Sequence, residues 1–235
     1  MRVHALTPAA ACDGVNAVKR LIVNADDFGM TEGVNQGIID AHVRGVLTST
    51  SLMVHGAAAE HAAHLAGENP GLSVGLHFVD DSPALDDTDH AGREFAAQLG
   101  HFRELMGSEP THVDSHHHVH MRRLSTFAGF VEPLGVPRRG DGRVRYIGAF
   151  YAHPRTGVID RDRIREPFLL RLLETEVTAE FTELGCHPGE VTTELHSSYR
   201  EEREIELATL TEPGLPAKIE ALGLTLASYR DWRPA

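Results

Sequence analysis

The feature of this sequence that most constrains its fold is a regular alternation of short apolar runs with segments of helical periodicity. Leu21–Val23 is a continuous apolar run, which is typical of a buried strand. The next segment places Val34, Ile38 and Ala41 at the i, i+4 and i+7 positions of a helix. Further strands are expected at 46–54, 72–78, 111–114, 144–151, 181–186 and 224–229, and further helices at 57–65, 94–106, 124–134, 164–174, 201–210 and 217–222. This order predicts right-handed strand–helix–strand units and a parallel sheet, open or closed.

The length of the chain favours a single domain. It has 235 residues, which one compact α/β barrel accommodates. There is no internal repeat and no low-complexity linker, so we expect one domain over residues 20–235. Residues 1–19 are expected to form an irregular extension. Thr7 and Pro8 interrupt any apolar stretch there, which argues against a secretory signal and makes a cytoplasmic location the default expectation.

The charge balance excludes some classes of partner. The 22 Lys and Arg residues are outnumbered by 34 Asp and Glu residues, and the formal net charge is −12. An acidic chain does not suit the phosphate backbone of a nucleic acid or an anionic membrane surface, because both attract basic residues. No apolar run approaches the ~20 residues that a transmembrane helix needs. The two cysteines do not make a disulfide framework.

Side chains that can bind metal ions or transfer protons follow four of the expected strands. The first strand runs into Asp26 and Asp27, and the third ends at His77. The fourth runs into His116, and a later strand ends at His187. Parallel strands share one direction, so their carboxyl ends meet at one rim, where the functional groups of such folds gather. We therefore expect these side chains to lie in a single site.

Each of these residues also has a purely structural interpretation. An isolated Asp pair is most often a turn or the start of a helix, and a lone His is more often packed than catalytic. Together, Asp27, His77 and His116 complete a set of two imidazoles and one carboxylate, which suits a divalent metal ion. At a strand end, one carboxylate of the Asp26–Asp27 pair can bind a metal while the other meets a water. The Pro-Gly turn after His187 would fix that histidine at the rim.

The histidine tract at 116–120 is open to two interpretations. Histidine-rich segments are often solvated loops, and His117 and His118 can simply face water. If the strand continues instead, alternation places His116, His118 and His120 on one side of it. His112, inside the expected strand, is interpreted as a hydrogen-bonded core or interface histidine.

Five segments of the chain, in order, resemble a known family. They are LIVNADDFGMTEGVNQGI, GVLTSTSLMV, VGLHF, THVDSHHHVH and CHPGE. Together they are similar to the YdjC-type carbohydrate deacetylases, which include the diacetylchitooligosaccharide deacetylase and the hopanoid-biosynthesis-associated deacetylases. The resemblance covers the chain from Arg20 to Tyr229. It implies a distorted (β/α) barrel of mostly parallel strands, of the NodB-like glycoside hydrolase and deacetylase type.

The resemblance also implies an activity, which is the hydrolysis of an N-acetyl group on an amino sugar or acetylated oligosaccharide with release of acetate. The family's metal ligands fall on Asp27, His77 and His116. Its catalytic base falls on Asp26, and a late histidine, here His187, is the candidate acid. The family's metal is usually Mg²⁺, although two imidazoles suit Zn²⁺ or another transition ion at least as well. The implied partner is a small N-acetylated sugar, and dimers occur in the family, which leaves a homodimer open.

Two other functions share this ligand set. Non-haem Fe(II) oxygenases also use two histidines and one carboxylate, and a non-catalytic metal-binding protein would need no more. A second carboxylate beside the first, on a parallel α/β frame, suits hydrolysis better than oxygenation. Asp26 and His187 speak against mere metal binding, because neither is needed to hold an ion. The segment 79–92 is short and acidic where relatives often carry a longer loop, and this departure leaves the identity of the sugar open.

Overall fold

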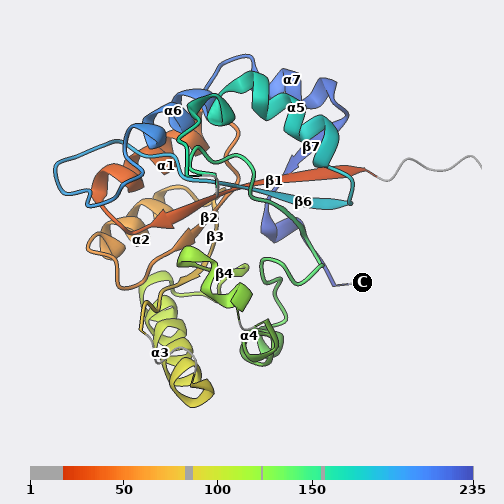
Figure 1. The fold of residues 1–235 in the computed structure, drawn as a ribbon. Helices are drawn as coiled ribbons and strands as arrows, with labels where there is room; N and C mark the ends of the chain where they lie inside the picture. Colours follow the sequence, from red (N-terminus) through yellow and green to blue (C-terminus); the bar gives the residue numbers. More distant parts are fainter. Residues whose placement is uncertain (1–17, 83–86, 123, 155–156, 235) are drawn as a thin grey trace, which may run out of the picture.

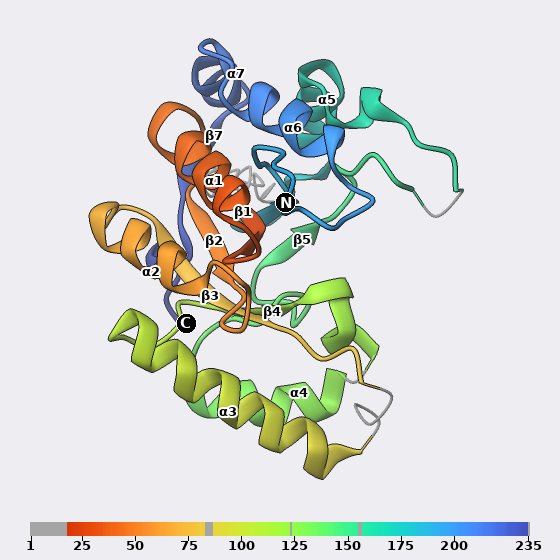
Figure 2. The same cartoon turned by 90° about the vertical axis from the view of Figure 1, so that its left-hand side faces the viewer.

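The structure is a computed structural model that describes residues 18–82, 87–122, 124–154 and 157–234. Seven strands form one sheet in this part of the chain, and all of the pairs are parallel, as the sequence predicts. The strands are β1 (Lys19–Phe28), β2 (Ser49–Leu52), β3 (Ser73–Phe78), β4 (Val113–Ser115), β5 (Arg145–Ile147), β6 (Phe181–Cys186) and β7 (Leu224–Ala227). Their order is β4-β3-β2-β1-β6-β5, and β7 pairs with β1. Figure 1 labels these strands except β5, which is labelled in Figure 2.

Helices follow one another around the outside of this curved sheet (Figure 2). They are α1 (Glu32–Arg44), α2 (Ala59–Glu68), α3 (Thr88–Met106), α4 (Leu124–Val131), α5 (Glu166–Glu176), α6 (Glu201–Leu210) and α7 (Leu215–Ala221). Helix α1 packs against α2 and α6, α2 packs against α3, and α3 packs against α4. The expected distorted barrel of parallel strands is therefore confirmed.

Strand β1 is the centre of the sheet because it is long enough to serve three partners. Its first half, Lys19–Ile22, pairs with β7, and its second half pairs with β2 from Asn24 onward. Strand β6 lies along it from Arg20 to Ala25. The apolar residues 21–23 of β1 are fully buried, as expected for a strand that is covered on both faces.

Helix α1 holds the loop after β6 close to the end of β1. The side chain of Thr31 caps the helix by accepting a hydrogen bond from the backbone N–H of Val34. Gly37 faces this loop, and a Cβ there would lie 2.5 Å from the Cα of Gly189. Since no side chain fits between the two backbones, glycine at position 37 allows the close approach that places the loop with His187 beside β1.

Two expectations about local structure are wrong, and one question that the sequence left open is decided. Strand β1 continues through Asp26 and Asp27 to Phe28, although the Asp pair was expected to follow the strand. Of the two interpretations of the histidine tract, the continued strand is excluded, because β4 ends at Ser115 and residues 116–122 form a kinked 3₁₀ helix. The kink arises because His117 and His118 both adopt a φ of 52°. Helix α3 begins at Thr88, inside the segment 79–92 that was expected to be a loop.

The expected N-terminal extension is only partly described. Residues 1–17 lie outside the described residues, and Lys19 already belongs to β1. No helix of the described part of the chain is both long enough and apolar enough to cross a bilayer.

Candidate functional site

Four strand ends meet at one cavity, as the sequence predicts. The cavity has a volume of about 350 Å³ and lies at the carboxyl ends of β1, β3, β4 and β6. Its lining includes all five residues that the strand ends suggested, which are Asp26, Asp27, His77, His116 and His187.

Three of these residues bring potential metal ligands together. Ligand atoms of Asp27, His77 and His116 all lie within 4.8 Å of one another. Nδ1 of His116 is 3.0 Å from Oδ1 of Asp27, and Nε2 of His77 is 3.5 Å from the same oxygen. Nε2 of His77 is buried and has no hydrogen-bond partner among the described residues. Two imidazole nitrogens and a carboxylate oxygen, one of the nitrogens otherwise unused, fit a divalent metal ion.

Asp114 sets the orientation of the His77 ring. Nδ1 of His77 donates to Oδ1 of Asp114 at 2.6 Å, and Oγ of Ser51 donates to the other carboxylate oxygen at 2.9 Å. This arrangement leaves Nε2 of His77 facing Asp27, as in the carboxylate–histidine–metal groupings of known metal sites. Burial alone would lower the pKa of His77, but the Asp114 carboxylate outweighs it and raises that pKa to about 10. A cation is therefore stabilised at this position, whether it is a proton or a metal ion.

A buried arginine neutralises Asp26, the carboxylate of the Asp pair that is not among the three potential ligands. Nη1 and Nη2 of Arg139 donate to the two carboxylate oxygens of Asp26 at 2.8 and 2.7 Å. The same guanidinium lies 2.5 Å from Glu183 and 2.8 Å from Asp114. Burial would raise the pKa of Asp26, but Arg139 outweighs it and holds that pKa below its usual value. Ligand atoms also lie within 4.8 Å of one another in a second group, Asp26, His77 and Asp114. There Arg139 already supplies the positive charge that a metal ion would bring.

A second arginine acts in the same way on Asp27. Nη2 of Arg203, in α6, donates to Oδ2 of Asp27 at 2.6 Å. That contact leaves Oδ1 of Asp27 facing the two imidazoles. Although burial opposes it, Arg203 holds the pKa of Asp27 well below its usual value. The backbone of Asp27 has a φ of 69°, a left-handed conformation that is unfavourable for residues other than glycine and is common at functional sites.

His187 faces Asp26 across the cavity. Its Nε2 is 3.9 Å from Oδ2 of Asp26, and its ring packs against the rings of Tyr151 and Tyr199. The backbone N–H of His187 donates to Glu206 at 2.5 Å, which ties the loop to α6. Burial lowers the pKa of His187 to about 4, so the imidazole is neutral at neutral pH. Any proton that it delivers must reach it during the reaction.

The other histidines of the tract divide between the cavity and the core. His118 lines the cavity, and His117 lies at its edge with Nδ1 3.4 Å from Asp81. His120 is buried, with hydrogen bonds to Ser115 and to the backbone of residue 139. His112 is also buried, with the centre of its ring 3.8 Å from that of Tyr229, which agrees with the expected core position. Its Nε2 has no hydrogen-bond partner among the described residues.

The sequence analysis missed four charged residues of this site. Asp114 lies within a segment that was singled out only for its histidines, and Arg139 lies between the helix expected at 124–134 and the strand expected at 144–151. Arg203 and Glu206 fall in a helix that was predicted from its periodicity alone. The signal that marks these residues is burial, because a charged side chain is rarely buried without a partner. Burial cannot be read from the sequence.

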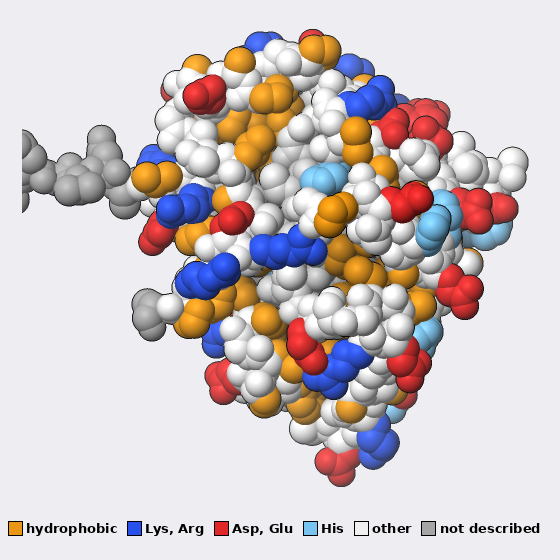
Figure 3. Space-filling view, turned by 180° about the vertical axis from the view of Figure 1, so that it is seen from behind, with side chains coloured by type: hydrophobic (Ala, Val, Ile, Leu, Met, Phe, Trp, Pro, Cys, Tyr) orange, Lys and Arg blue, Asp and Glu red, His pale blue; other side chains and the backbone are white. Residues whose placement is uncertain are grey.

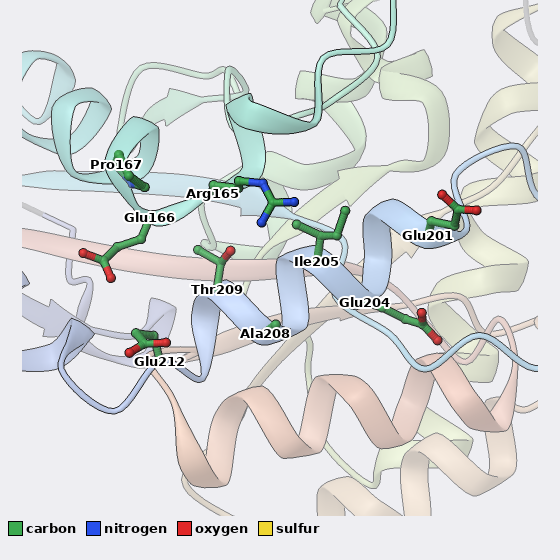
Figure 4. Close-up of a pocket in the computed structure, with 9 residues that line it drawn as sticks. All are labelled: Arg165, Glu166, Pro167, Glu201, Glu204, Ile205, Ala208, Thr209 and Glu212. Carbon is green, nitrogen blue, oxygen red and sulfur yellow. The ribbon is translucent and has the colours of Figure 1, made fainter.

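Among the residues that the structure describes, the other surface cavities do not combine Asp and His side chains in this way. A groove of about 500 Å³ between the start of α5 and the length of α6 presents glutamates (Figure 4), with Glu166, Glu201, Glu204 and Glu212 among its lining residues. It holds none of the strand-end residues. On the face that Figure 3 shows, acidic, basic and hydrophobic side chains are interspersed, so the net charge of −12 is not gathered into one acidic patch there.

Comparisons with known proteins agree with the geometry. The family model described as "YdjC-like protein" matches residues 20–83 and 79–221. A chitooligosaccharide deacetylase from Serratia marcescens is 37% identical over 91% of this chain and 99% of its own length. The crystal structure of a putative cellobiose-phosphate cleavage protein from Enterococcus faecalis is 28% identical, with a TM-score of 0.75 over 90% of this chain and 98% of that chain.

A more distant structure shares the fold. The polysaccharide deacetylase of Bacillus cereus is 14% identical, with a TM-score of 0.59 over 92% of this chain and 96% of that chain. Together with the family model, which covers more than half of the sequence, these comparisons show that the chain belongs to the family of YdjC-like proteins.

Proposed function

We propose that this protein is a metal-dependent hydrolase that removes an N-acetyl group from an amino sugar or an acetylated oligosaccharide and releases acetate. The observation that carries the proposal is the strand-end cluster in which Asp27, His77 and His116 converge beside the separately neutralised carboxylate of Asp26. The name of the Serratia marcescens relative, a chitooligosaccharide deacetylase, supports the same reaction.

Asp27, His77 and His116 would hold one divalent ion. Such an ion supplies polarisation of the acyl oxygen and a lower pKa for its bound water. Family resemblance favours Mg²⁺, whereas the two imidazole nitrogens suit zinc or another transition ion at least as well. Elemental analysis of the purified protein decides between them.

Asp26 would act as the general base. Arg139 holds both of its oxygens and keeps it ionised, which is the form that can accept a proton from the attacking water. Asp26 shares the cavity with the metal cluster but is not needed as a ligand. The distance of 3.9 Å between Oδ2 of Asp26 and Nε2 of His187 supports a proton transfer between these two groups.

His187 would act as the general acid. An amine is a poor leaving group unless it is protonated as the C–N bond breaks, so a group must deliver a proton to its nitrogen. With its pKa near 4, His187 is neutral before the reaction. We infer that the proton which Asp26 takes from water passes to Nε2 of His187 and from there to the departing amine, so that protons balance over the cycle.

The experiment that tests the function measures two products at once. The metal-loaded protein is incubated with N-acetylated glucosamine saccharides, and acetate release and O₂ consumption are recorded together. Acetate release without O₂ consumption supports the hydrolase. O₂ consumption would favour the oxygenase that shares this ligand set, and neither signal from a fully metal-loaded protein would favour a metal-binding protein.

We also propose a cytoplasmic location, a single domain over residues 20–235 and a homodimer. The single domain is supported by the one sheet that contains both β1 and β7. Cell fractionation, limited proteolysis and light scattering test these three proposals in turn.

A further inference from the structure

Helix α6 contains a fully buried carboxyl group without a cationic partner, that of Glu206. The ion pairs that this helix forms among the described residues involve Glu201, Glu202 and Arg203, and none involves Glu206. With no cation paired to it, burial raises the pKa of Glu206 to about 8. A buried carboxyl group that no charge neutralises is costly, so we looked for the contacts that it serves.

The two oxygens of Glu206 hold the two ends of one segment, residues 187–199. Oε2 accepts a hydrogen bond from the backbone N–H of His187 at 2.5 Å, directly after β6. Oε1 accepts a hydrogen bond from the hydroxyl of Tyr199, two residues before α6 begins. The backbone oxygen of Arg203 adds a third link by accepting from the N–H of Gly189 at 3.3 Å. The segment that carries His187 is therefore anchored to α6 mainly through one side chain.

The imidazole of His187 forms no hydrogen bond with the part of the chain that the structure describes. Its Nδ1 is buried without a partner, and its Nε2 lies 3.9 Å from Oδ2 of Asp26, which is longer than a hydrogen bond. The ring of His77, in contrast, is fixed by a hydrogen bond to Asp114. The direction in which His187 presents Nε2 therefore depends on its backbone position and on the rings that pack against it.

Tyr199 is one of those rings, and its hydroxyl is held on two sides. Besides donating to Glu206, the hydroxyl accepts a hydrogen bond from the backbone N–H of Ala152 at 3.3 Å. The ring of Tyr199 lies edge-on to that of His187, with the centres 5.6 Å apart, and is stacked on the ring of Tyr151 at 4.7 Å. Glu206 therefore reaches His187 by two routes, one through the backbone and one through the Tyr199 ring.

We propose that Glu206 is a positioning residue that sets the orientation of the His187 imidazole for proton delivery to the departing amine. This proposal rests on the proposed function, in which His187 is the general acid. Arg203, one turn earlier in α6, holds the carboxylate of Asp27 at 2.6 Å. Residues three apart lie on the same face of a helix. One face of α6 thus aligns both a metal ligand and the proton donor.

A double-mutant cycle between Glu206 and His187 tests the proposal in the metal-loaded protein. Glu206→Met removes both hydrogen-bond acceptors and keeps a long side chain in the buried site. It should lower kcat for acetate release from N-acetylglucosamine oligosaccharides about 10–100-fold, with little change in KM, because the acid is misplaced. In a His187→Ala background the same change should alter kcat by less than about twofold, since the group that Glu206 orients is gone.

An activated ester and two further variants separate positioning from general stability. With 4-nitrophenyl acetate, whose leaving group needs no proton, Glu206→Met should lose far less activity than with the amide, and its metal content should be unchanged. Glu206→Gln keeps an acceptor for the N–H of His187 and should retain most of the activity on the amide. Glu204→Met, at an exposed position of the same helix, is the matched control and should change neither activity.

The pattern of losses decides the role of Glu206. Equal losses on amide and ester, or the same loss with and without His187, would show a merely structural role and overturn the proposal. If Glu206→Met does not fold, Tyr199→Phe removes one route and keeps the ring; it should lose about threefold to tenfold on the amide alone, and an unchanged value would overturn the proposal. Acetate release by the wild type without these effects leaves the proposed function intact, whereas no release by the metal-loaded wild type overturns both.

Discussion

Replacement of Arg139 by methionine should destabilise the protein strongly at neutral pH. The wild-type guanidinium is fully buried and lies within 2.5–2.8 Å of carboxylate oxygens of Asp26, Asp114 and Glu183. Removing one partner of a buried ion pair costs about 3–5 kcal/mol, because the other charge is left uncompensated. Here one cation serves three carboxylates, so we expect a loss of at least about 3–5 kcal/mol. That is a large part of the roughly 5–15 kcal/mol that stabilises a typical domain.

The loss in free energy of unfolding should depend on pH, and the structure predicts the direction. With Arg139 present, the pKa values of Asp26 and Asp114 are lowered on folding, so these groups stabilise the wild-type protein above their unfolded pKa. Without the guanidinium, burial raises the pKa values of the folded carboxylates above their unfolded values. Their unfavourable contribution is then largest at high pH and decreases as the pH falls and they become protonated. The difference between wild type and variant should therefore be larger at pH 8 than at pH 5.

Urea denaturation at pH 5, 6, 7 and 8, followed by circular dichroism, measures this difference. Arg145→Met is the matched control, since Arg145 also forms an ion pair at 2.5 Å, with Glu176, but is 42% exposed. The control should lose no more than about 1 kcal/mol at any pH. If Arg139→Met lost less than about 1 kcal/mol, or lost the same amount at every pH, the buried cluster would not have the energetic role that the structure assigns to it.

Four further predictions concern the site. His116→Ala should lose bound metal and activity together, and a normal metal content would refute its assignment as a ligand. Asp114→Asn should keep the fold but weaken metal affinity about 10–100-fold, because the His77 ring loses its carboxylate partner. Titration calorimetry with Zn²⁺ measures the affinity, and an unchanged value would contradict this role of Asp114. Asp26→Asn should retain the ion and lose turnover by about 10²–10⁴-fold, whereas an empty site would show that Asp26 is itself a ligand. His187→Ala should retain metal and slow acetate release from amides far more than from activated esters, whose leaving groups need no proton; equal losses on both would exclude the acid role.

The sequence by itself determined the architecture and the place of the site. The alternation of apolar runs and helical periods predicted the parallel sheet, and it gave the bounds of β6 and α6 correctly. Because parallel strands share one direction, their ends predicted that Asp27, His77 and His116 converge. These are local signals, since periodicity and strand ends depend on residues that are near one another in the chain.

Only the tertiary structure decided which charges meet. Arg139 is 113 residues from Asp26, and Arg203 is 176 residues from Asp27. Neither pair has a spacing or periodicity that could reveal it, because the partners come from different elements that meet only when the sheet curls. The path of the histidine tract was also undecided, since His116–His120 could continue the strand or leave it. The left-handed backbone at His117 and His118 ends the strand there, and His116 is left facing Asp27 while His120 turns into the core. The physical reason is that pairing and burial of charges are properties of the folded interior, where a guanidinium stabilises whichever carboxylates the fold brings within reach.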